Sequence, residues 1–91
     1  MNRQTQSNGV EGIHSLKHLV VRLAHALVEK EDRVELDVWH DADGVTLIPS
    51  VAPEDLTRII GPQGRTIRSL RTVLGAASMK NKQGYSLELR D

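Results

Sequence analysis

A turn bracketed by two glycines, Gly61-Pro62-Gln63-Gly64, constrains the fold of this chain more than any other feature, because it separates two segments with helical patterns. Glycine adopts backbone conformations that other residues avoid, so we expect a left-handed conformation at Gly61 that ends the first helix. Gly64 has no Cβ atom, which lets a ligand approach the start of the second helix closely. The turn therefore predicts a short helix and a longer one that meet at a sharp corner.

Charge is segregated along the chain, although the net charge is zero. The turn lies in a run, residues 56–87, that has six basic and no acidic side chains, whereas residues 29–55 have two basic and nine acidic ones. This segregation predicts a positive face, unless the acidic segment folds against the basic one and cancels it. The basic residues of the run are Arg58, Arg65, Arg68, Arg71, Lys80 and Lys82. Arg65 stands at a helix start, where backbone N–H groups and the helix dipole favour a phosphate.

The composition indicates one small domain with an aliphatic core. The chain has 91 residues, no Phe, one Trp and one Tyr, so Leu, Ile, Val and Ala must form the core, and pairing with another chain would stabilise it. The absence of Cys excludes disulfides and is typical of a reducing compartment. Residues 1–12 are polar and predict a flexible tail, and no run has the length and apolarity of a membrane span. We expect a cytoplasmic protein whose single domain covers residues 13–91.

Periodicity in the first half of the chain predicts one helix and a β-hairpin. Residues 13–29 carry apolar side chains at the spacing of one helical face, namely Ile13, Leu16, Val20, Leu23 and Leu27. Residues 33–40 alternate like a strand with one buried face, formed by Val34, Leu36 and Val38. Residues 41–44 predict a turn and residues 45–51 the returning strand. Pro49 cannot donate a ladder hydrogen bond, so we expect this strand to lie at an edge or to be bulged.

The second half predicts two helices and a last strand. Pro53, followed by two acidic residues, is typical of a helix start, and this short helix should end at Gly61. The next helix should cover residues 64–78, with a buried side formed by Ile67, Leu70, Val73, Leu74 and Ala77. A polar loop at residues 79–84 precedes a strand at residues 85–89, on which Tyr85, Leu87 and Leu89 share one face. The order α-β-β-α-α-β predicts an α+β domain with helices packed on one face of a three-stranded sheet.

This order, with Ile59-Ile60-Gly-x-x-Gly-Arg65 at the junction of the paired helices, resembles a type II KH domain. The segments at residues 51–56 and 66–73, on either side of the junction, are similar to small bacterial proteins that consist of a single KH domain. The likeness extends over residues 13–91. It implies a loop that clamps the sugar-phosphate backbone of about four single-stranded nucleotides, with the bases in an apolar groove.

The resemblance implies RNA-binding roles for particular residues. Gly61, Pro62, Gln63 and Gly64 would form the clamp, surrounded by Arg58, Arg65, Arg68 and Arg71. Ile59, Ile60 and Ile67 would form the floor of the groove or its support. Tyr85 would begin the far wall, and Lys80 and Lys82 would lie in the variable loop before it. One departure is Pro62-Gln63, because the family usually has Lys or Arg in one of these positions; phosphate affinity is therefore expected to be lower.

The remaining candidates point away from enzymatic chemistry. His14, His18 and His25 form, with Val21 and Val28, a second stripe on the first helix, which predicts a partner interface or a solvated face because a zinc site needs a further ligand. Trp39, on the polar side of its strand, hints at an interface. No nucleophile is paired with a base in any hydrolase pattern, so we expect no enzymatic activity, no metal and no cofactor.

The sequence therefore favours a protein that holds single-stranded RNA. The resemblance implies a homodimer, or a heterodimer with a larger protein that contains KH and R3H domains. It also implies a role as an RNA chaperone or post-transcriptional regulator linked to cell shape and division. Two alternatives remain open. A KH-fold protein-interaction module with little RNA affinity would agree with Pro62 and the zero net charge. A helix-hairpin-helix DNA binder also holds phosphate at a glycine turn, although it usually has one residue between its glycines.

Overall fold

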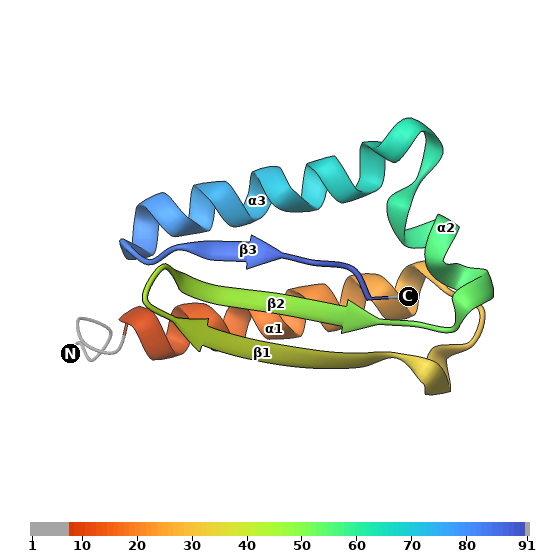
Figure 1. Cartoon of the computed structure of the whole chain (residues 1–91), viewed down its shortest axis with the longest axis horizontal. Coiled ribbons are helices and arrows are strands. Elements are labelled where there is room, and N and C mark those ends of the chain that lie inside the picture. The colour runs from red at the N-terminus through yellow and green to blue at the C-terminus, as the bar shows by residue number, and fades with distance from the viewer. Residues whose placement is uncertain (1–7, 91) are drawn as a thin grey trace.

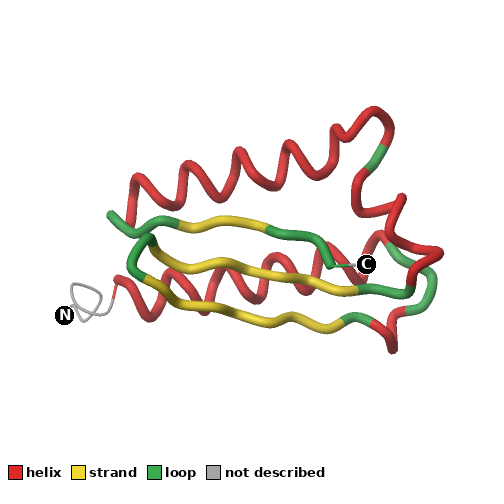
Figure 2. The backbone as a smooth tube through the Cα atoms, in the orientation of Figure 1, coloured by secondary structure: helices red, strands yellow, loops and turns green. Residues whose placement is uncertain are grey.

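Six helices and strands follow one another in the order α-β-β-α-α-β, in the residues 8–90 that the computed structural model describes (Figures 1 and 2). They are α1 (Asn8–Leu27), β1 (Glu35–Asp41), β2 (Gly44–Ser50), α2 (Leu56–Ile60), α3 (Arg65–Asn81) and β3 (Tyr85–Leu87). Short 3₁₀ turns at Glu31–Arg33, Pro53–Asp55 and Pro62–Gly64 connect them. The predicted α+β order is confirmed.

The three strands form one sheet in the order β1-β2-β3. β1 and β2 are antiparallel and are joined by a tight turn, whereas β2 and β3 are parallel. α1 lies behind β1 and β2, and α3 runs alongside β3 (Figure 1). The two helices meet the sheet in one apolar core, which includes Leu16 and Val20 of α1, Leu47 of β2, Leu74 of α3 and Leu87 of β3. A small sheet covered on one face by helices is thus the frame that positions the glycine turn.

α1 begins and packs differently from the prediction. Its first residues, 8–12, fall within the expected tail, while residues 1–7 of that tail lie outside the described part of the chain. Its buried side chains are Leu16, Val20 and Ala24, whereas Leu23 and Leu27 are only partly buried. Val28, which we expected beside the histidines, is 7% exposed and packs with Ala24 and Ile59. The small side chain of Ala24 lets α2 approach the end of α1, and this approach selects the buried face.

β2 is the central strand, so the expectation that Pro49 marks an edge or a bulge is wrong. Val45 N donates to Gly84 O over 2.8 Å and Leu47 O accepts from Glu88 N over 3.0 Å, so every second residue of β2 presents its backbone groups to β3. Pro49 is the next residue in this series and has no N–H to donate. The ladder with β3 stops at Leu47, and beyond it only an isolated bridge joins Ser50 to Arg90. A central strand tolerates the proline because its partner ends there.

α3 is longer than predicted, and part of its expected core face is exposed. It continues to Asn81, so only residues 82–84 remain of the polar loop expected at 79–84. Ile67 and Leu74 are buried and Leu70 and Ala77 pack against the core, but Val73 is 45% exposed. Val73 belongs to neither apolar cluster of residues 8–90, because α3 directs Leu74 and its neighbours Leu70 and Ala77 toward the core instead. None of the described helices has the length and apolarity needed to cross a membrane.

Candidate nucleic-acid interface

The glycine turn (residues 61–64) projects at one end of the molecule, where α2 and α3 meet (Figure 2). Gly61 has φ 80° and ψ 169°, so its φ is positive as expected, but its backbone is extended rather than left-handed. Gln63 and Gly64 adopt the left-handed conformation instead. A Cβ atom on Gly61 would lie 2.2 Å from Thr66 Oγ1, so only glycine fits there. The turn is therefore built by two different glycine conformations.

The backbone of the turn uses several of its own hydrogen-bonding groups. Gly64 N donates to Gly61 O over 3.0 Å, and Arg65 N donates to Pro62 O. Arg68 Nη1 donates to Gln63 O over 2.8 Å, so this guanidinium braces the turn from the first turns of α3. With these amides engaged and no N–H on Pro62, a phosphate at the turn has to be held mainly by arginine side chains.

The four arginines near the turn fall into two groups. Arg65, Arg68 and Arg71 are exposed and, within residues 8–90, form no ion pair with a carboxylate. Arg58 lies 3.1 Å from Glu29 and 3.4 Å from Asp55, so its charge is already balanced. The cancellation that we considered for the acidic and basic segments therefore occurs at Arg58 and leaves α3 positive.

The carboxylate of Asp55 fixes the position of α2. From the sequence we expected this residue only to mark the start of a helix. Asp55 is 1% exposed and accepts hydrogen bonds from Glu29 N over 3.2 Å and from Lys30 N over 3.0 Å. The hydrogen bond from the Lys30 amide lowers the pKa of the Asp55 carboxyl, and the Glu29 amide and the Arg58 charge lower it further against the opposing effect of burial. Lys30 also pairs with Glu54 over 2.6 Å. These contacts tie the end of α1 to the helix that carries the turn.

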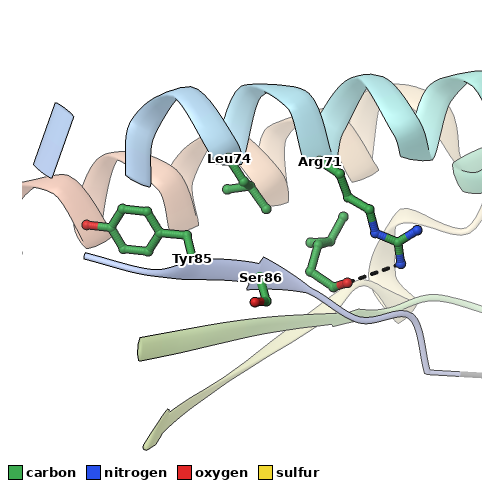
Figure 3. Close-up of a pocket in the computed structure, with 5 residues that line it drawn as sticks. Arg71, Leu74, Tyr85 and Ser86 are labelled. Carbon is green, nitrogen blue, oxygen red and sulfur yellow. Dashed lines mark hydrogen bonds between the residues drawn. The ribbon is translucent and has the colours of Figure 1, made fainter. Parts of the chain in front are cut away.

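A groove lies between α3 and β3 (Figure 3). Its volume is about 280 Å³, and it is lined by Arg71, Leu74, Tyr85, Ser86 and Leu87. Arg71 reaches across it from α3, where its Nη2 donates to Leu87 O over 3.2 Å (Figure 3). Tyr85 lines the groove as expected, but the residue is only 7% exposed and its hydroxyl accepts a hydrogen bond from Asn81 Nδ2 over 3.2 Å. The groove thus has an apolar floor and one cationic wall.

The other expected RNA-binding residues lie elsewhere. Ile60 packs partly buried against the core, and Ile59 and Ile67 are buried, so the three isoleucines support the groove rather than line it. Lys80 is in the last turn of α3 and Lys82 is the left-handed residue after it. At about 1.5 Å per residue, Lys80 is roughly 22 Å along the helix from Arg65. The two lysines therefore lie at the end of α3 that is far from the glycine turn. The expectation that Lys80 lies in a loop is wrong, because α3 includes it.

The histidine stripe has no metal-binding geometry in the described residues. His14 and His18 are exposed and line a shallow hollow with Lys17, Val21 and Leu36. His25 Nδ1 lies 3.2 Å from Glu31 Oε1 instead of pointing to the other two histidines. Residues 8–90 contain no group of three His, Cys, Asp or Glu side chains that could hold a metal ion.

Comparisons with known proteins point to one family. A family model described as "KhpA/KhpB, KH domain" matches residues 17–89. The RNA-binding protein KhpA of Caldanaerobacter subterraneus subsp. tengcongensis is 38% identical over 71 residues, which cover 78% of this chain and 95% of that protein. The RNA-binding protein KhpA of Halalkalibacterium halodurans is 38% identical over 76 residues, 84% of this chain and 100% of that protein. The RNA-binding protein KhpA of Borreliella burgdorferi is 37% identical over 73 residues, which cover 80% of this chain and 89% of that protein. This chain belongs to the KhpA/KhpB family of KH domains.

Proposed function

We propose that this protein binds single-stranded RNA across the glycine turn and the groove between α3 and β3. The observation that carries the proposal is the run of Arg65, Arg68 and Arg71, which leads from the turn to the groove without a carboxylate partner in the described residues. Similar proteins from three bacteria are named RNA-binding proteins, and these names support RNA as the ligand. In this proposal the protein acts as a binding protein and not as an enzyme.

The proposed site has a charged part that binds the RNA backbone and an apolar part that binds a base. The sugar-phosphate backbone lies along the turn, where Arg65 and Arg68 neutralise phosphates. A base enters the groove above Leu74 and Leu87, where it removes apolar surface from water. Because the turn's own carbonyls occupy the amides of Gly64 and Arg65, we expect modest affinity that depends strongly on salt.

A second KH surface would compensate for a small site. The outer side of α3 exposes Val73 and Met79, at 45% and 83%, with exposed Ala76 between them at helical spacing. We propose that another KH domain packs on this stripe, either from a second copy of this chain or from a larger KH- and R3H-containing partner of the KhpB type. Burial of these side chains would stabilise the pair through the hydrophobic effect.

The cellular role that we propose is that of an RNA chaperone or post-transcriptional regulator in the cytoplasm, linked to control of cell shape and division. It rests on membership of the family rather than on a contact in this molecule.

Binding of single-stranded RNA, single-stranded DNA and duplex DNA across a salt series tests the ligand. The test variant is Pro62→Asp/Gln63→Asp, and Pro62→Ser/Gln63→Asn is the matched neutral control. Two carboxylates at the turn should repel phosphate and weaken binding of single-stranded RNA at least tenfold, while the neutral control should stay within about threefold of the native chain.

Three results would contradict the proposal. Equal RNA binding by the native chain and the folded Asp variant would exclude the turn as the site. Preference for duplex DNA would favour a helix-hairpin-helix mode. Failure of the native chain to bind any nucleic acid, together with pairing to another KH protein, would favour an interaction module.

A further inference from the structure

The face of the sheet that α1 and α3 leave uncovered carries an exposed tryptophan. In β1, Leu36 and Val38 are partly buried toward the helices, so Trp39 points to the opposite face. Trp39 is 62% exposed, the largest exposure of any described aromatic side chain. It lies opposite Thr46 in β2, which in turn lies opposite Ser86 in β3. A large ring beside two small hydroxyl side chains leaves room for a ligand on this row.

A hollow of about 170 Å³ adjoins the same row. It is lined by Thr46 and Ser86 from the strands and by Asp41, Asp43 and Gly44 from the hairpin turn, with Val45. Asp41 Oδ1 accepts hydrogen bonds from Asp43 N over 2.8 Å and from Gly44 N over 3.1 Å, which shapes the turn. The Asp43 carboxylate has no ion-pair partner within residues 8–90. The hollow therefore offers the Asp43 carboxylate and the second Asp41 oxygen, and Thr46 in its lining pairs with Trp39 across the strands.

The surroundings of the hollow are acidic. Glu35, Asp37 and Glu88 occupy the same face by strand alternation and are exposed. Arg90 neutralises Asp37 over 2.7 Å. Lys82 precedes Gly84, whose carbonyl accepts a hydrogen bond from Val45 N, by two residues. This surface repels phosphate, whereas the unpaired arginines of the proposed RNA site belong to α3.

We propose that this surface, which consists of Trp39, Asp41, Asp43, Thr46 and Ser86 and is named the Trp39 face, docks an arginine-rich segment of a partner protein. A guanidinium stacks on an indole ring through cation–π attraction and pairs with carboxylates in a planar geometry. The Trp39 face carries both groups, because Trp39 and Asp41 lie two residues apart in β1 and so point to the same face of the sheet. The hydroxyls of Thr46 and Ser86 accept the remaining N–H groups. This inference does not depend on RNA binding.

Fluorescence of the full chain tests the proposal, because Trp39 is the only tryptophan. The probe is an acetylated and amidated peptide of alternating glycine and arginine, and the control probe is the same peptide with glutamate. We expect a saturable change in Trp39 emission with the arginine peptide and none with the glutamate peptide. Asp43→Asn should weaken binding about threefold, the size of one exposed ion pair.

Asp32→Asn is the matched control variant, since Asp32 is also an exposed acid without an ion pair in the described residues but lies in the turn before β1. It should leave the peptide affinity unchanged. Equal weakening by both variants would show attraction to net charge alone and would overturn the proposal. So would the absence of a saturable signal, or a larger response of Trp39 to single-stranded RNA than to the arginine peptide. The Pro62→Asp/Gln63→Asp variant should bind the peptide normally, which separates this site from the RNA site.

Discussion

At the scale of single residues, two positions are required by geometry rather than by chemistry with a ligand. Gly61 combines a positive φ with an extended ψ, a region that is essentially restricted to glycine, and its missing Cβ makes room for Thr66. Asp55 is buried and holds two backbone amides of the segment after α1. Both residues act before any RNA is bound, because they set where the turn lies.

Gly61→Ala should destabilise the fold by about 1–3 kcal/mol from backbone strain, with a further loss from the contact with Thr66. Gly75→Ala is the matched control, since a Cβ there meets nothing within 4 Å in the middle of α3. It should stabilise the protein by about 0.5–1 kcal/mol. Urea unfolding of both variants measures the difference. Equal effects of the two substitutions would show that Gly61 is not special.

Asp55 should make the stability of the native chain depend on acidity. Its folded pKa is lowered, so its contribution is present above the unfolded pKa of about 3.9 and is lost as the pH falls through the lower folded pKa. Asp55→Asn should therefore be less stable at neutral pH and should show a flatter decline of stability below about pH 4. Urea unfolding at a series of pH values measures both effects. A decline as steep as that of the native chain would assign the acid sensitivity to other carboxyls.

At the scale of elements, α3 carries most of the proposed RNA site. Its first turns brace the glycine turn through Arg68, its middle supplies Arg71 and Leu74 to the groove, and its outer side exposes Val73 and Met79. β3 contributes the opposite wall, and it is short because Pro49 in β2 removes the next ladder bond. The groove therefore depends on a helix and a strand that only the tertiary fold places side by side.

Arg71 should contribute both charge and a directed contact to RNA binding. Arg71→Gln removes both, so it should weaken binding about five- to tenfold and lower the salt-dependence slope by about 0.7, the value for one phosphate on a single strand. Arg71→Lys keeps the charge but loses the planar guanidinium. The salt-dependence slope of this variant should equal that of the native chain, while its affinity for RNA falls. Arg33→Gln, on the turn before β1, is the control that removes a distant charge. Identical slopes for Arg71→Gln and Arg33→Gln would exclude a phosphate contact at Arg71.

At the scale of the whole molecule, charge and apolar surface are distributed over different sides. The acidic segment balances Arg58 and Lys30 at the end of α1 and leaves the arginines of α3 unpaired in the described residues. The open face of the sheet is acidic around Trp39. A molecule with zero net charge can thus attract phosphate on one side and cations on another.

Val73→Glu should shift the oligomeric state if a second KH domain packs on α3. Sedimentation of the native chain should show a concentration-dependent dimer, and the charged side chain should weaken it because the carboxylate would be buried without a partner. Leu19→Glu is the matched control, since Leu19 is an exposed apolar residue of α1. Dissociation by Leu19→Glu but not by Val73→Glu would move the interface to α1.

Local patterns determined much of this protein. The order of helices and strands, the hairpin turn at residues 41–44 and the corner at Gly61 and Gly64 could be predicted, because periodicity, proline and glycine act over a few neighbouring residues. The charge of α3 was also visible, since no acidic residue interrupts residues 56–87.

The tertiary structure decided which of these features are available to a partner. Arg58 is paired with a carboxylate, whereas Arg71 reaches the groove. Val28 is buried and Val73 is exposed. Pro49 lies in the central strand of the sheet. The physical reason is the same in each case. Burial, ion pairing and strand neighbours depend on segments that are distant in sequence, such as Glu29 beside Arg58, and no local pattern carries that information.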